Sequence, residues 1–300
     1  MSSISDAVAA LRRGGLVAFP TETVYGLGAD AANRDAVRRL YAVKGRPPDH
    51  PVIAHIGRDA TLDEYARDVP AVANVLARAF WPGPLTLILH RRPERVVAEV
   101  AGGRGTVGLR VPDHDIALDL LDAFGGAIAA PSANRFGRVS PTTAAHVRAD
   151  LGEDVDVVLD GGATRVGVES TIVDCTTGGL TVLRVGAISA AQLAEVTGGD
   201  VPFGTGVAAP GTLASHYAPR ARVELVDRGD VDARLAAVRA EGLRAGVLDA
   251  PADVAEYARV LYARLRAADD DGLEVVLAVL PPDDGGLGTV VRDRLRRAAG

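Results

Sequence analysis

The pattern best suited to chemistry in this chain is a lysine and an arginine separated by one residue, Lys44 and Arg46. The chain has 33 basic residues, and Lys44 is the only lysine among them. A compact ammonium on a flexible stem contacts an anion in ways that a planar guanidinium cannot reproduce. Pro47 and Pro48 favour an extended backbone, so the two cations can approach one phosphate from different sides. The pattern predicts a phosphate site, although a solvated surface lysine explains the position of Lys44 alone equally well.

Arg110 is the next candidate because it interrupts an expected apolar strand, Val107–Val111. A guanidinium that is buried without a partner costs a large amount of free energy. Its partner must therefore be either an internal carboxylate or an anionic ligand. We favour the ligand.

Polar side chains also follow other expected strands, at the position where open α/β sheets place ligands. Ser132 and Asn134 form a Ser-x-Asn motif just after a short apolar strand. With Ser140 they offer donors that suit a phosphate or a ribose, and capping of the next helix is the competing explanation for Ser140. The segment Pro20–Gly28 contains Thr23, and its hydroxyls and backbone amides can orient a small polar substrate.

Further candidates are chosen by their location in the chain. A glycine-rich bend after Asp160 leads into Glu169-Ser170-Thr171, and Arg184 ends the strand that follows. His50 and His55 flank the strand after Lys44, which makes them the best placed of the histidines.

Together these segments describe a groove with one lysine, three arginines and several hydroxyls, but no obvious general-base carboxylate. Such a site suits substitution at phosphorus, where positioning and neutralisation of charge supply most of the catalysis. The nucleotide-binding fingerprint GxxxxGK[ST] is absent, no GxGxxG follows an expected strand, and the GxSxG elbow of hydrolases is missing. The lone Cys175 and the lack of CxxC or HxxxH spacing argue against a disulfide framework and a zinc site.

The composition is that of a globular chain with two domains. Its 300 residues are 48% hydrophobic and 24% charged, and the formal net charge is −6. That charge gives no general attraction to nucleic acid or to an anionic membrane, so an anion site must be local. No apolar run is long enough to span a bilayer, and no signal-peptide pattern is present. We expect a cytoplasmic, reduced protein without membrane contact.

An α/β fold is predicted, with a catalytic domain over residues 1–200, a linker or lid over 201–219 and a small domain over 220–300. In the first domain, strands outnumber the helices needed for strict βαβ repetition, which indicates a twisted mixed sheet. Its helices are expected at Ser5–Arg13, Asn33–Val43, Val69–Phe80, Asp115–Phe124 and Thr142–Leu151. Its strands are expected at Leu16–Phe19, Val52–Ile56, Leu85–Leu89, Val107–Val111, Ala127–Ala130, Val155–Leu159, Thr171–Val173 and Thr181–Val185.

The last eighty or so residues show a regular β-α-β-α-β-α series, which predicts a small open, Rossmann-like α/β domain with parallel strands. Its strands are expected at Arg222–Val226, Ala245–Leu248 and Glu274–Ala278. Its helices are expected at Val231–Ala240, Val254–Ala267 and Thr289–Ala298.

These motifs, in the same order along the chain, resemble those of the YrdC-type threonylcarbamoyl-AMP synthases in their long form, which carries an extra C-terminal domain. The resemblance rests on Pro20–Gly28, Lys44-x-Arg46, Gly83–Thr86, Leu109–Pro112, Ser132-x-Asn134, Glu169–Val173 and Leu183–Gly186. In the last third it rests on Pro210-Gly211, His216–Pro219, Gly286–Gly288 and Asp293–Leu295. It covers the chain nearly from end to end and implies a YrdC-like twisted mixed sheet with a concave groove.

The resemblance implies a reaction in which ATP, L-threonine and bicarbonate give L-threonylcarbamoyl-AMP, pyrophosphate and water. The threonine amine would be carboxylated first, and the carbamate would then attack the α-phosphorus. A tRNA threonylcarbamoyl transferase complex would use the adenylate to modify the adenosine beside the anticodon. Mg²⁺ is expected on the triphosphate, held by phosphates and water, with no protein metal site.

The resemblance also assigns roles to residues. Lys44 and Arg46 would be the catalytic pair that neutralises the phosphates. The implied ATP-binding set is Lys44, Arg46, His50, Thr106, Ser132, Asn134, Ser140, Arg184 and Tyr217. The implied threonine-binding set is Thr23, His55, Arg110 and Ser170. Tyr217 lies in the linker, which would close over the site as a lid.

The chain departs from the family pattern at two places. His50-Pro51-Val52 stands where the family often has Asn-Pro-Leu, and Thr212–Ser215 stands where the linker usually carries a long side chain. The individual role of His50 and the details of linker closure are therefore open.

Two other functions are compatible with parts of the pattern. A double-stranded RNA-binding or ribosome maturation factor would use the concave face, but backbone recognition of RNA needs a broad basic surface, so a net charge of −6 leaves at most weak RNA binding. A carbamoyl-transfer domain for metal-centre maturation would normally lie in a larger chain with zinc fingers, and this chain has no CxxC.

Overall fold

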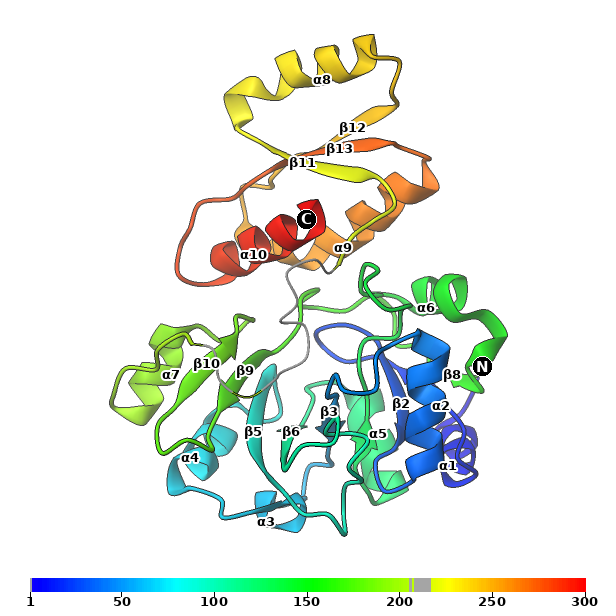
Figure 1. Ribbon diagram of the computed structural model, residues 1–300, viewed down its shortest axis with the longest axis vertical. Helices are drawn as coiled ribbons and strands as arrows, with labels where there is room; N and C mark the ends of the chain where they lie inside the picture. The colour runs from blue at the N-terminus through cyan, green and yellow to red at the C-terminus, as the bar shows by residue number, and fades with distance from the viewer. Residues whose placement is uncertain (1, 205–206, 208–216) are drawn as a thin grey trace.

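The computed structural model describes residues 2–204, 207 and 217–300, which form a large and a small α/β unit (Figure 1). Most of the predicted linker over 201–219, including Thr212–Ser215, lies outside the described residues. The domain boundaries at residues 200 and 220 stay predictions.

The large unit is built on one mixed sheet. Its strands are β1 (Val17–Phe19), β2 (Gly26–Asp30), β3 (Ile53–His55), β4 (Ala66–Arg67), β5 (Leu85–Arg91), β6 (Thr106–Arg110), β7 (Ile128–Ala129), β8 (Val157–Val158), β9 (Thr171–Asp174) and β10 (Thr181–Arg184). Within the described ranges the sheet has ten strands in the order β10-β9-β5-β6-β3-β7-β2-β1-β8, with β4 paired on β5. The pairs β3–β6 and β5–β9 are parallel, whereas β1–β2 and β5–β6 are antiparallel. The predicted mixed sheet is confirmed.

Helices cover both faces of this sheet. They are α1 (Ile4–Arg12), α2 (Arg34–Lys44), α3 (Leu62–Tyr65), α4 (Ala71–Phe80), α5 (Asp115–Phe124), α6 (Ala144–Leu151) and α7 (Ala190–Thr197). Side chains alternate between the faces of a strand, so Val17 and Phe19 of β1 pack with α1 and α5. Leu16 and Ala18 point the other way, into a larger core that α2, α4, α6 and α7 share.

The end of α2 places the Lys44–Arg46 pair. Asn33 accepts hydrogen bonds from the backbone N–H groups of Asp35 and Ala36 and so caps the start of the helix. Gly45 ends it in the left-handed region at φ 64°, which glycine adopts without strain. Lys44 is therefore the last helical residue, and the chain turns sharply before Arg46.

The sequence prediction missed β2, α7 and the short elements α3 and β4. The glycines of β2 suggested a loop, but they belong to a tightly packed strand. A Cβ on Gly28 would lie 2.7 Å from Ile128 Cγ2 and 2.9 Å from the Phe19 ring, so only glycine fits between the neighbouring strands. Helix α7 begins at a capping box formed by Ser189 and Gln192, a signal that was present in the sequence.

The small unit confirms the predicted parallel series. Strands β11 (Arg222–Val226), β12 (Ala245–Leu248) and β13 (Val275–Val279) are all parallel and lie in the order β11-β13-β12. Helix α8 (Val231–Ala240) covers one face, and α9 (Val254–Asp270) and α10 (Leu287–Ala299) cover the other (Figure 1). Figure 1 shows α9 and α10 on the side that faces the large unit. No helix in the described ranges combines the length and apolar character needed to cross a membrane.

Candidate active site

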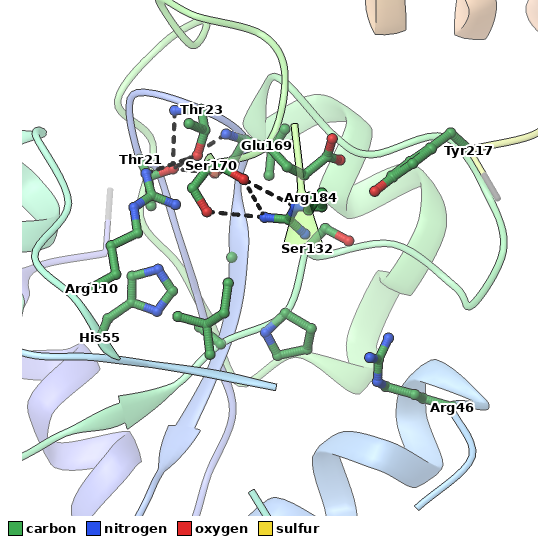
Figure 2. A pocket seen from close by; sticks show the side chains of 15 residues that line it. Thr21, Thr23, Arg46, His55, Arg110, Ser132, Glu169, Ser170, Arg184 and Tyr217 are labelled. Carbon is green, nitrogen blue, oxygen red and sulfur yellow. Dashed lines mark hydrogen bonds between the residues drawn. The ribbon is translucent and has the colours of Figure 1, made fainter. Parts of the chain in front are cut away.

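A cavity in the large unit brings together side chains from widely separated parts of the chain (Figure 2). Its wall includes most of the predicted site residues: Thr23, Arg46, His55, Arg110, Ser132, Ser170, Arg184 and Tyr217. Thr21 and Glu169 also line it, and neither was predicted. Lys44, His50, Thr106, Asn134 and Ser140 are not among the residues that line it.

Arg110, at the end of β6, pairs with Glu22. Its Nη2 lies 2.6 Å from Glu22 Oε2, and both side chains are almost fully buried, at 5% and 2% exposure. Arg110 also donates to the Thr23 hydroxyl at 3.0 Å and to the Gly83 carbonyl at 3.2 Å. Of the two partners considered for Arg110, the structure shows the internal carboxylate, while the guanidinium also lines the cavity, so a contact with a ligand stays a prediction. Glu22 itself does not line the cavity, so it supports Arg110 from behind.

His55 lies beside Arg110 because β3 and β6 pair in parallel with these two residues in register. Its ring packs edge-on against Phe19, with centroids 5.9 Å apart. Burial, together with the nearby charge of Arg110, lowers the pKa of His55 to about 3. The imidazole is therefore neutral at physiological pH and acts as a hydrogen-bonding group, not as a cation.

We expect His55 to make the protein less stable in acid. The unfolded side chain titrates near pH 6.5 and the folded one near 3, so between these values only the unfolded state binds the proton. The stability that the neutral folded histidine provides is thus present above pH 6.5 and is lost as the pH falls toward 3. Between about pH 7.5 and about pH 4.5 this loss amounts to about 2 to 3 kcal/mol.

Chemical denaturation of the wild type and of His55→Asn at both pH values measures this contribution. In His55→Asn, the free energy of unfolding should not show this loss of about 2 to 3 kcal/mol between the two pH values. An equal pH dependence in the two proteins would contradict the assigned shift.

Arg184 and Ser170 form the middle of the cavity (Figure 2). Arg184 donates through Nε and Nη2 to the Ser170 carbonyl, at 3.0 and 2.8 Å, and through Nη2 to the Ser170 hydroxyl at 3.0 Å. The same hydroxyl lies 2.9 Å from Thr86 Oγ1. The pairing of β10 with β9 has a register shift between Val182 and Arg184, so Arg184 lies opposite Ile172.

Lys44 lies behind the cavity wall, not on it. Its ammonium donates to the backbone carbonyls of Ser132 and Asn134, both at 2.5 Å, and its side chain is only 2% exposed. Burial, and secondarily the charge of Arg46, lowers the pKa of Lys44 well below its usual value. Lys44 therefore anchors the segment that carries the Ser-x-Asn motif.

Arg46 does reach the cavity. It is held by hydrogen bonds to the carbonyls of His50, at 3.2 Å, and Pro51, at 2.9 Å, and it lies over the Phe136 ring at 5.6 Å. The ring of His50 lies 5.6 Å from the same Phe136 ring, so His50 contributes a carbonyl and packing. Asn134 uses its amide to donate to the carbonyls of Arg135 and Arg138, both at 2.8 Å.

Two more residues of the implied ATP-binding set lie off the wall of this cavity, and their assignment to ATP stays a prediction. Thr106 begins β6 and pairs with His90, at the opposite end of the strand from Arg110. Ser140 does not cap α6: Thr143 does, by accepting from the His146 N–H. Ser140 instead donates to Glu169 Oε1 at 2.7 Å.

Sequence reasoning found no carboxylate in the groove, yet Glu22 and Glu169 are both buried beside it. Each is paired with an arginine, Arg110 and Arg294 respectively. The sequence did contain evidence for these carboxylates, because both glutamates stand inside polar motifs that are otherwise uncharged. Neither carboxylate is a free base, because each already neutralises a buried guanidinium.

Comparison with known proteins matches both units. The family model described as "Telomere recombination" matches residues 9–186, and the model described as "Threonylcarbamoyl-AMP synthase, C-terminal domain" matches residues 188–300. A threonylcarbamoyl-AMP synthase of Pyrococcus abyssi is 41% identical over 97% of this chain and 92% of its own length. One from Bacillus subtilis is 39% identical over 99% of this chain and 93% of its own length.

A solved structure agrees with these matches. The crystal structure of P. abyssi Sua5 complexed with L-threonine superposes with a TM-score of 0.93, at 41% identity, over 99% of this chain and 94% of that one.

Proposed function

The chain belongs to the threonylcarbamoyl-AMP synthase family, and from this premise we propose that its cavity joins L-threonine, bicarbonate and ATP into L-threonylcarbamoyl-AMP. The observation that carries the assignment is a single cavity with cationic side chains at both ends. Arg110, with Thr23 and His55, lies at one end, and Arg46, with Ser132 and Tyr217, lies at the other (Figure 2). One cationic end suits the carboxylate of threonine, and the other suits the triphosphate of ATP.

Threonine binds at the Arg110 end in this proposal. The guanidinium is fixed by Gly83, Thr23 and Glu22, so it meets the substrate carboxylate without reorganising. Neutral His55 and the hydroxyls of Thr23 and Ser170 are hydrogen-bonding groups for the rest of the amino acid. Because His55 stays uncharged, it adds no repulsion toward the substrate ammonium.

ATP binds at the other end, with Arg46 and Arg184 facing its phosphates and Ser132 and Tyr217 beside the nucleotide. The threonine amine takes up bicarbonate to give a carbamate and water. A carbamate oxygen then attacks the α-phosphorus, the bond to the bridging oxygen breaks, and pyrophosphate leaves. The protein contributes alignment of the two substrates and neutralisation of negative charge, since none of the described carboxylates on the wall is free to act as a base.

Mg²⁺ enters this reaction with ATP. Among the described residues there is no group of three histidine, cysteine or acidic side chains able to hold a metal. The Glu169 carboxylate on the wall is already occupied by Ser140, Tyr262 and Arg294. The donor set therefore fits an ion carried by phosphate oxygens and water.

The adenylate is an activated acyl donor, so we assign its use to a tRNA threonylcarbamoyl transferase complex in the cytoplasm. The direct test of the function is pyrophosphate release from ATP, with threonine and bicarbonate supplied singly and together. We expect release, and an adenylate of the mass of threonylcarbamoyl-AMP, only when both are present. Release that is independent of either substrate would overturn the assignment.

A further inference from the structure

Glu169, on the cavity wall, is held by side chains of the small unit. Its Oε2 accepts from the Tyr262 hydroxyl of α9 at 2.8 Å and from Arg294 Nε of α10 at 2.9 Å. Its Oε1 accepts from Ser140 of the large unit at 2.7 Å. Burial acts to raise the pKa of Glu169, but Arg294, Arg184 and the two hydroxyl donors together lower it. Glu169 is thus an ionised carboxylate on the cavity wall that both units hold in place. We call the contacts that Tyr262 and Arg294 of the small unit make with it the clamp.

Arg294 is the largest of the fully buried side chains among the described residues, with no exposed surface. Besides Glu169, its guanidinium contacts Asp293 and donates through Nη2 to the Val185 carbonyl at 2.9 Å. Val185 directly follows Arg184, and Glu169 directly precedes Ser170. Arg294 of the small unit therefore contacts both of the segments that contain Arg184 and Ser170, the residues in the middle of the cavity.

The same arginine fixes Tyr217. The Arg294 guanidinium lies over the Tyr217 ring at 5.1 Å from its centroid, and Tyr217 stacks on Tyr262 with centroids 5.6 Å apart. Tyr217 has a φ of 64°, a conformation that is unfavourable for a residue with a side chain. Contacts of the ring with Tyr262 and Arg294 explain how this backbone conformation persists.

We propose that Arg294 and Tyr262 are positioning residues of the active site, through which the small unit orders the nucleotide end of the cavity. They act through Glu169 and Tyr217 and do not line the cavity themselves. The apolar contacts around them support this role, because Val24, Val139 and Val168 of the large unit share one core with Tyr257, Leu261 and Leu295 of the small unit. The role of the small unit is then to complete the site, not only to stabilise the fold. The inference rests on the proposed function for the identity of the nucleotide.

The proposal is tested with the full chain by measuring KM for ATP, KM for threonine and binding of ATP by calorimetry. Tyr262→Phe removes one hydroxyl and keeps the ring; we expect KM for ATP to rise about 10-fold. Arg294→Met removes the clamp and should raise KM for ATP by more than Tyr262→Phe does. Arg110, Thr23 and His55 lie at the other end, so KM for threonine should change less than 3-fold in both. Arg296→Met, on the exposed face of the same helix, is the matched control and should behave as wild type.

The double variant Glu169→Gln/Arg294→Met separates positioning from charge compensation. Removing both members of the Glu169–Arg294 pair avoids leaving either one buried without the other, so stability should return toward wild type relative to either single variant. If Arg294 positions Tyr217, KM for ATP stays high in the double variant. Recovery of both stability and KM for ATP would overturn the proposal, as would Tyr262→Phe and Arg294→Met enzymes whose KM for ATP equals that of wild type. A wild-type chain that binds ATP but makes no adenylate would overturn the proposed function instead, and the binding comparison would still test the clamp.

Discussion

Replacing Lys44 with arginine is expected to lower kcat/KM for ATP about 100-fold, because it moves the segment that carries Ser132 by enough to misalign the nucleotide. The Lys44 ammonium occupies a slot with 2% exposure, where it donates to the carbonyls of Ser132 and Asn134. A guanidinium is wider and planar and cannot make both contacts from the last turn of α2. Steady-state pyrophosphate release against ATP concentration measures the loss.

The same variant separates two roles of Lys44. If Lys44 served only as a phosphate contact, Lys44→Arg would leave the nucleotide-free protein as stable as wild type. Because the ammonium anchors a backbone segment, we expect the substitution to lower the free energy of unfolding by about 1–3 kcal/mol without ATP. Urea denaturation of the nucleotide-free proteins decides between these outcomes. Unchanged stability would refute the anchor, and wild-type turnover would refute any functional role of Lys44.

Replacing Arg110 with lysine is expected to raise KM for threonine about 100-fold, the cost of losing a charge-assisted hydrogen-bond pair. Arg110 spans Gly83, Thr23 and Glu22 and still presents its guanidinium at the cavity wall. A lysine has one ammonium and cannot contact these three groups and a substrate carboxylate at once. It does keep a positive charge opposite Glu22, so the buried carboxylate is not left unpaired.

For Arg110→Lys, initial rates are measured against threonine concentration and against ATP concentration, and the two KM values are compared with those of wild type. KM for ATP should stay within about 3-fold of wild type, since the phosphates lie at the other end of the cavity. Arg78→Lys is the matched control, because Arg78 is exposed on α4. If KM for threonine were the same in Arg110→Lys and wild type, threonine would not bind at Arg110.

Most of the regular structure followed from local patterns. The predicted α8 and β11 agree with the structure residue for residue, as does α5. In these segments the period of the apolar side chains, 3.6 for helices and 2 for strands, is set by the elements themselves. β2 was missed because the spacing to Phe19 and Ile128, not the local pattern, demands glycine at position 28.

The site was predictable in part for a different reason. Thr23, Arg46, His55, Arg110, Ser132, Ser170, Arg184 and Tyr217 belong to motifs that the sequence carries as strings, and all of them line one cavity. Thr106 does not line that cavity, and its assignment to ATP stays a prediction. Lys44 was assigned to the right segment, but the direction of its ammonium depends on carbonyls from a loop about ninety residues away.

Local patterns along the chain predicted most of the helices and strands, the mixed and parallel sheets, the family motifs and the cationic character of the groove. Which buried charge neutralises which became evident from the folded structure. Arg110 pairs with Glu22, and Glu169 pairs with Arg294 across 125 positions of the chain. The physical reason is that a buried ion is neutralised only by a side chain that the packing places within about 4 Å of it. That neighbourhood is set within the large unit for Arg110 and between the two units for Arg294, and it has no period or spacing in the chain.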